Sequence, residues 1–259
     1  MTELPPLDGS VLPDGIRARF VERVNGLRVH ILEAGEPDRP CLLLLHGFPE
    51  LAYSWRKIMG RWPLPGITSS LPICAGRVVP PGGAPITTTI CARSADWKDN
   101  KPHKLTGWTA TELAKMPTYY VMDLAEDMPT AVAKEMPSPA EIAACHWLPD
   151  DELAVYAGEY RRNGFQGGLN WYRSRTSGMF EAELQLYSGK TVDVPSIFIS
   201  GSSDWGVYQR PGAVERMNGT ACTRMTGVHL LDGAGHWVQQ EQAEKVTELL
   251  LGFLRSTNP

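Results

Sequence analysis

The sequence predicts an α/β layered protein, in which strands and helices alternate and a helical insertion lies between about residues 95 and 190. Three observations predict this class. Short apolar runs typical of strands occur towards both ends of the chain, at residues 41–45, 194–200 and 228–231. Residues 138–164 are punctuated like two helices. The last part of the chain carries an apolar stripe at helical spacing.

The N-terminal part of the chain predicts strands. Asn25-Gly26 is expected to turn a hairpin with one solvent-facing side, because this dipeptide favours two-residue turns and residues 27–33 alternate between apolar and polar. The run at residues 41–45 is continuously apolar, which is typical of a strand buried on both faces of a largely parallel sheet. That run ends at residues 46–50, His-Gly-Phe-Pro-Glu.

The expected helices have recognisable ends. Ser138 to Glu141 form a capping box with proline at the first helical position. Asp150 is expected to cap a second helix, which Asn163 and Gly164 end. The final helix should cover one face of the sheet with a stripe made of Val246, Leu249, Leu250, Phe253 and Leu254.

Composition excludes several classes of function. A net charge of −4 gives no reason to expect nucleic acid or an anionic membrane as a partner. We expect no secretory signal, and no apolar run approaches the roughly 20 residues that span a bilayer. The five cysteines are scattered without a C-x-x-C pair, which favours the cytoplasm. Without a phosphate-binding glycine loop or a cluster at metal-ligand spacing, we expect no cofactor and no metal.

Three chain positions are candidates for chemistry. His46, Gly47, Phe48 and Pro49 follow an apolar strand, where backbone N–H groups can act as oxyanion donors. Asp204 and then His236 each follow a later strand, and a carboxylate can orient an imidazole that activates water or a nucleophile. A single strand-end histidine is more often structural, and a single aspartate is more often a turn residue. The three positions together, in this order, favour catalysis.

These segments resemble the epoxide hydrolases, a family of α/β-hydrolases. Residues 46–50 followed by Ser54-Trp55-Arg56 are similar to their oxyanion segment, residues 201–206 to their acid loop, and residues 233–241 to their histidine loop. Leu169-Asn170-Trp171-Tyr172-Arg173 resembles the end of their helical cap, where a tyrosine hydrogen-bonds the epoxide oxygen. The resemblance implies catalytic roles for Asp204, His236 and Tyr172. Candidates for a second cap tyrosine are Tyr119 and Tyr120.

The resemblance also implies a nucleophile that this sequence lacks. The family uses an aspartate in a small-x-Asp-x-small elbow upstream of the cap, and nothing between Pro49 and the cap has that pattern. Asp96 has no strand before it and no glycine after it. Asp204 fits the elbow pattern, but it lies after the cap and residues 208–212 do not promptly begin a helix. We interpret Asp204 as the acid, since otherwise His236 would have no acid partner.

Residues 61–94 fit neither a strand nor a helix, and a loop of that length is uncommon in a compact domain. Translated one base out of register, Ser69 to Gly76 permit Ile-Ala-Pro-Asp-Leu-Arg-Gly, which resembles the next strand and turn of the family. We interpret the segment as out of frame, followed by loss of the nucleophile region. The four expected parts are core (1–60), irregular segment (61–94), helical cap (95–190) and core (191–259).

The expected fold is therefore an α/β-hydrolase sheet that lacks its central strands and carries a helical cap. Losing several buried strands predicts poor solubility or a partly disordered chain. The first functional hypothesis is hydrolysis of a small apolar epoxide to a diol, impaired by the missing nucleophile. The alternatives are a non-catalytic or small-molecule-binding protein, a dehalogenase-type hydrolase, and direct activation of water by His236 and Asp204. The oligomeric state stays open.

Overall fold

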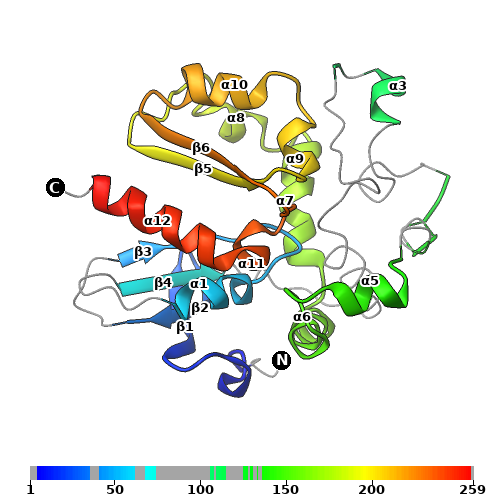
Figure 1. The fold of residues 1–259 in the computed structure, drawn as a ribbon, viewed down its shortest axis with the longest axis vertical. Coiled ribbons are helices and arrows are strands. Elements are labelled where there is room, and N and C mark those ends of the chain that lie inside the picture. The colour runs from blue at the N-terminus through cyan, green and yellow to red at the C-terminus, as the bar shows by residue number, and fades with distance from the viewer. Residues whose placement is uncertain are drawn as a thin grey trace. The chain divides into compact units, whose positions relative to one another are not determined.

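The computed structural model describes residues 5–35, 41–61, 68–73, 106–107, 109–114, 125–127, 129–130, 133 and 136–257 (Figure 1). The chain divides into two compact units. Unit 1 comprises Met1–Ala84 and Pro149–Leu186, and unit 2 comprises Pro85–Leu148 and Tyr187–Pro259. The division into four parts that the sequence suggested stays a prediction. In the part of the chain that the structure describes, no helix is long and apolar enough to cross a membrane.

Unit 1 contains a four-stranded sheet in the order β1-β2-β4-β3. The strands are β1 (Ile16–Val24), β2 (Leu27–Ala34), β3 (Cys41–Leu43) and β4 (Thr68–Ile73). β2 pairs antiparallel with both β1 and β4, whereas β3 and β4 are parallel. The short helix η1 (Gly9–Val11) precedes this sheet, and η2 (Ala52–Trp55) and α1 (Arg56–Met59) follow β3.

The predicted hairpin is confirmed, with one difference in burial. Asn25 and Gly26 have φ angles of 50° and 78°, as a two-residue primed turn requires, and they join β1 to β2. The expected solvent-facing side of β2 is not present, since Val29, His30, Ile31 and Leu32 are all buried. The N-terminal segment explains part of this burial, because the Leu7 backbone N–H donates to His30 Nε2 at 3.1 Å.

Two predictions about the strands of unit 1 are wrong. Residues 61–94 were expected to lack regular structure, yet the backbone of β4 pairs with both β2 and β3. The run at residues 41–45 was expected to be buried on both faces, yet Leu43 and Leu45 are 54% and 64% exposed while Leu44 is buried. One face of β3 is therefore uncovered, and an apolar sequence alone could not reveal whether anything packs against it.

The helical stretch of unit 1 consists of α6 (Asp150–Asn163), α7 (Gln166–Thr176) and α8 (Glu181–Gln185). The predicted cap is off by one residue: Asp150 is the first helical residue and Pro149 is the N-cap, so the Asp150 carboxylate favours the positive end of the helix dipole instead. The predicted end is confirmed, because Gly164 is the C-cap with a φ angle of 68°.

Unit 2 contains two parallel neighbours, β5 (Ser196–Gly201) and β6 (Met225–Leu231), which lie side by side in Figure 1. Its helices are α3 (Ala110–Leu113), α5 (Pro139–Ala144), α9 (Trp205–Tyr208), α10 (Ala213–Arg216), the π-turn η3 (Met217–Ala221), α11 (Val238–Glu241) and α12 (Ala243–Thr257). The capping box at Ser138 is confirmed. Along α12, Val246 is buried and the remaining stripe residues are half-buried.

Candidate active site

Unit 2 brings Asp204 and His236 into contact. The carboxyl ends of β5 and β6 lie at one edge because the two strands are parallel neighbours, and each residue follows one of these ends. His236 Nδ1 lies 3.0 Å from Asp204 Oδ1. The aspartate side chain is 10% exposed and the histidine side chain 35%, so the carboxylate is enclosed while the imidazole reaches solvent.

Several donors hold the Asp204 carboxylate in place. Ser200 Oγ donates to Oδ2 at 2.9 Å, and the Gly206 backbone N–H donates to Oδ1 at 2.8 Å. Burial raises the pKa of Asp204, but the hydrogen bond and charge of His236, together with these two donors, outweigh burial and hold the pKa below its ordinary value. Asp204 is therefore an anion at neutral pH, as an acid partner for histidine must be.

The sequence argument about the helix after Asp204 needs a correction. The one-turn helix α9 begins directly after Asp204, and the Asp204 side chain caps it. A prompt helix is part of the elbow pattern, so its expected absence no longer separates an acid from a nucleophile at this position. The contact with His236 supports the acid role, which stays a prediction.

Glu241 fixes the loop that carries His236. Its carboxylate accepts the Gly235 backbone N–H through Oε2 and the Trp237 backbone N–H through Oε1, each at 2.8 Å. Sequence analysis quoted Glu241 as part of the loop but assigned it no role. Its position four residues after Trp237, at the start of α11, is the available signal, because an acidic side chain there can reach back to backbone N–H groups.

The acid loop and the histidine loop are in direct contact. The Ser203 backbone N–H donates to the Ala234 carbonyl at 3.0 Å, and the Ser202 N–H donates to the Leu231 carbonyl at 2.9 Å. A Cβ atom on Gly201 would lie 2.1 Å from the Ala234 carbonyl oxygen. Only glycine therefore permits the approach that brings Asp204 next to His236.

Unit 1 brings the predicted oxyanion segment next to Tyr172. The ring of Phe48 meets the rings of Tyr172, Tyr160 and Phe165 edge-on, with centroids 5.9, 6.3 and 6.3 Å away. A Cβ atom on Gly168 would overlap the Phe48 ring, at 2.1 Å from its nearest atom. The glycine before the Asn-Trp-Tyr-Arg segment thus allows α7 to lie against Phe48, which puts Tyr172 beside the turn.

Two further contacts define this turn. Tyr160 of α6 donates its hydroxyl to the Pro49 carbonyl at 2.6 Å. His46 Nδ1 lies 2.8 Å from the Gly47 carbonyl, and burial lowers the pKa of His46 although its backbone hydrogen bonds act in the opposite direction. Sequence analysis missed Tyr160, because no local pattern links it to a turn 111 residues earlier.

The Asp204–His236 pair can act as a general base. With its proton on Nδ1, His236 donates to Asp204 and presents a basic Nε2, the arrangement that activates water or a hydroxyl group. No group of three or more His, Cys, Asp or Glu side chains suited to a metal ion is found among the described residues. Asp96, Tyr119 and Tyr120 lie outside the described residues.

Comparison with known proteins gives a consistent result. No family model matches the sequence. The chain is 28% identical over 319 residues to epoxide hydrolase A of Mycobacterium tuberculosis, covering 89% of this chain and 95% of that relative. It is 36% identical over 112 residues to an epoxide hydrolase of Caballeronia sordidicola, covering 43% of this chain and 33% of the relative.

Solved structures share the fold. An epoxide hydrolase from an endophytic Streptomyces has a TM-score of 0.67 at 21% identity, covering 93% of this chain and 96% of that one. Potato epoxide hydrolase I has a TM-score of 0.63 at 23% identity, covering 93% and 99%. The predicted fold class is confirmed, and the short sheets are consistent with an incomplete one. The chain is therefore an epoxide-hydrolase-like protein with the α/β-hydrolase fold.

Proposed function

We propose that this chain retains the acid–histidine pair of an epoxide hydrolase but lacks the carboxylate nucleophile, so that it binds a small apolar epoxide without efficient turnover. The observation that carries the proposal is the hydrogen bond between Asp204 and His236, in loops that Glu241 and Gly201 hold together. A base with a fixed acid partner is what the hydrolytic half of such a reaction requires.

Two observations support the missing nucleophile. No aspartate upstream of the cap stands in a small-x-Asp-x-small elbow. The alignment with epoxide hydrolase A spans 319 residues, which exceeds the 259 residues of this chain, so that relative contains segments without a counterpart here. Without a nucleophile no alkyl-enzyme ester forms, and the water that His236 activates has no ester to attack.

Tyr172 is proposed to donate a hydrogen bond to the epoxide oxygen. Its support is the contact with Phe48, which brings a phenol from α7 to the turn whose backbone N–H groups are the proposed oxyanion donors. Tyr172 is about half exposed, so its hydroxyl is accessible to a ligand. The proposal also places the protein in the reducing cytosol, for which the scattered cysteines are the support.

The test combines turnover with intact mass. We expect the purified chain to leave styrene oxide unhydrolysed and to gain no covalent adduct, and the same for His236→Ala. If a carboxylate did attack, His236→Ala would accumulate the ester, because the substitution removes the base that hydrolyses it. An adduct in that variant overturns the proposal. Turnover that His236→Ala abolishes without an adduct would instead assign the activity to directly activated water.

Binding is tested separately. We expect styrene oxide or its diol to quench tryptophan fluorescence saturably in the wild-type chain, and Tyr172→Phe to weaken this binding about fivefold to tenfold, the loss of one hydrogen bond. Tyr187→Phe, a similarly exposed tyrosine, is the control and should bind like the wild type. Equal affinity in all three chains would contradict the role of Tyr172.

A further inference from the structure

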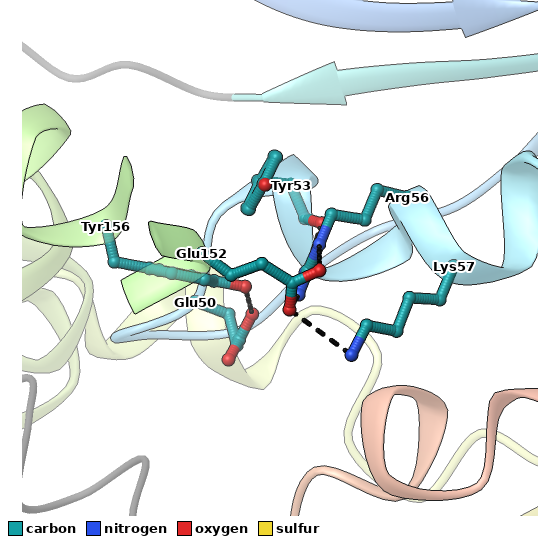
Figure 2. Close-up of polar contacts among 6 residues, drawn as sticks. All are labelled: Glu50, Tyr53, Arg56, Lys57, Glu152 and Tyr156. Carbon is teal, nitrogen blue, oxygen red and sulfur yellow. Dashed lines mark hydrogen bonds and ion pairs between the residues drawn. The ribbon is translucent and has the colours of Figure 1, made fainter. Parts of the chain in front are cut away.

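A buried carboxyl group joins the turn at residues 46–50 to α6. Glu50 is 3% exposed and Tyr156 is fully buried. The Tyr156 hydroxyl donates to Glu50 Oε2 at 3.0 Å, although the two residues are 106 positions apart (Figure 2). The Tyr160 hydroxyl, one turn further along α6, donates to the Pro49 carbonyl. Two tyrosines of one helix therefore fasten two consecutive residues of the turn.

An ion pair fastens the first turn of α6 to the same region. Arg56 is buried, and its guanidinium pairs with Glu152 through Nη2 and donates from Nε to Oε1 at 3.1 Å. Lys57 Nζ lies 3.2 Å from Glu152 Oε2, as Figure 2 shows. Arg56 also donates to the Tyr53 carbonyl at 2.9 Å, and its guanidinium lies 4.2 Å from the Tyr53 ring centroid. The interface thus contains two carboxyl groups close to one buried guanidinium.

The two carboxyl groups differ in their surroundings. Glu152 has the guanidinium and Lys57 beside it, so it is held as an anion. Glu50 is enclosed, and burial raises its pKa to about 7 although hydrogen bonds from Tyr156 and Ser54 and the charge of Arg56 act in the opposite direction. Both forms of Glu50 are therefore populated near neutral pH.

We propose that Glu50, Tyr156, Arg56 and Glu152 form a proton-controlled latch that fastens α6 to the turn at residues 46–50, tight when Glu50 is neutral and weaker when it is ionised. The groups packed around the Glu50 carboxyl or its turn are His46 before it, Tyr53 and Ser54 of η2, Arg56 and Lys57 of α1, and Glu152, Tyr156 and Tyr160 of α6. Arg56 already pairs with Glu152, so ionised Glu50 has only a share of its charge.

The sign follows from the raised pKa. A carboxyl group whose pKa is higher in the folded chain than its ordinary value of 4.5 stabilises the fold fully below that value, and this stabilisation is lost as the pH rises through about 7. The latch stands on contacts within unit 1 and does not depend on catalysis. Its consequence for the site, that the proton also sets how firmly Phe48 holds beside Tyr172, rests on the proposed function.

Thermal unfolding across pH tests the latch. Between about pH 5 and pH 8.5 we expect the melting temperature of the wild-type chain to fall by several degrees. Glu50→Gln, which imitates the neutral form, should remove this fall. Tyr156→Phe should shift the fall to higher pH, because the lost hydrogen bond favoured the ionised carboxylate. Glu33→Gln, the same substitution on β2, is the control and should keep the fall of the wild type.

Each outcome decides the question. A wild-type chain without a fall of melting temperature across this range overturns the latch, as does a fall that persists in Glu50→Gln. A fall that Tyr156→Phe leaves at the same pH removes Tyr156 from it. The readout is stability, so a chain that proves catalytically active would refute the proposed function and leave the latch standing.

Discussion

At the scale of single residues, the candidate site depends on a few buried hydrogen bonds. Asp204 and His236 were predicted from strand ends and chain order, and the structure puts their side chains 3.0 Å apart. The donors that hold Asp204 were not predicted, because Ser200 and Gly206 carry no signal beyond ordinary strand and turn composition. Residue type and order predict a role, whereas the strength of the acid depends on neighbours.

Asp204→Asn should destabilise the chain by about 1–3 kcal/mol at pH 7, since it removes the charge from a buried acceptor of three hydrogen bonds. The pKa of Asp204 is lowered, so its stabilisation is present above its ordinary value of 3.8 and is lost as the pH falls through the lower value in the folded chain. Urea unfolding at several pH values should show the difference shrinking in acid. Asp193→Asn, an exposed aspartate, should leave stability unchanged.

Gly201→Ala should destabilise the chain by about 1–3 kcal/mol, because the added Cβ would meet the backbone oxygen of Ala234 and push the acid and histidine loops apart. Gly252→Ala is the matched control: nothing lies near its Cβ, and alanine should stabilise α12 by about 0.5–1 kcal/mol. Urea denaturation of both variants measures the two effects. Equal stability of the two variants would show that the loops do not need their close approach.

At the scale of elements, turns and helix ends were predicted well and burial poorly. Asn25-Gly26 and Ser138 were predicted correctly because their signals act within a few residues. Asp150 was assigned one position too early in its helix, since Pro149 takes the cap. The strand β4 was missed because pairing with β2 and β3, rather than an apolar period, makes it a strand.

The uncovered face of β3 predicts a solubility defect that two substitutions should repair. Leu43→Thr with Leu45→Lys should raise the soluble fraction without lowering the midpoint of urea unfolding, because both leucines are exposed. Leu44→Lys, from the same run, should destabilise the chain by several kcal/mol, since Leu44 is buried. Centrifugation of lysates and denaturation of the purified variants measure both. Similar behaviour of Leu44→Lys and the double variant would mean that β3 has no uncovered face.

At the scale of the whole molecule, the described strands form a sheet of four and a sheet of two. An α/β-hydrolase buries its middle strands on both faces, and each fully buried aliphatic side chain contributes about 1.5–3 kcal/mol. A chain without those strands therefore loses much of its net stability of about 5–15 kcal/mol. The incomplete sheet and the aligned relative that is longer than this chain favour the same interpretation.

Calorimetry of the purified chain should show a broad transition, with a van't Hoff enthalpy well below the calorimetric enthalpy, because two units without a shared central sheet do not unfold cooperatively. One sharp transition with equal enthalpies in a purified monomer would contradict the loss of the central strands.

The origin of the missing region is testable in the gene. We expect the transcript to show a shift of register near Gly60-Arg61 and loss of the nucleophile-coding region before about Ala95. A message that encodes these residues in frame, with no neighbouring sequence for the elbow, would end the frameshift hypothesis. The proposed loss of catalysis would be unaffected, since it depends on the residues that the chain contains.

By itself, the sequence determined the features that act over a few residues: the hairpin turn, the helix caps, the strand ends that carry Asp204 and His236, and the order of acid before histidine. Only the tertiary structure decided which of these meet and which surfaces are covered. It brought Glu50 to Tyr156 across 106 positions, inserted β4 between β2 and β3, and left one face of β3 exposed. The reason is physical: a turn or cap forms from neighbouring backbone groups, whereas burial depends on residues that are distant in the chain.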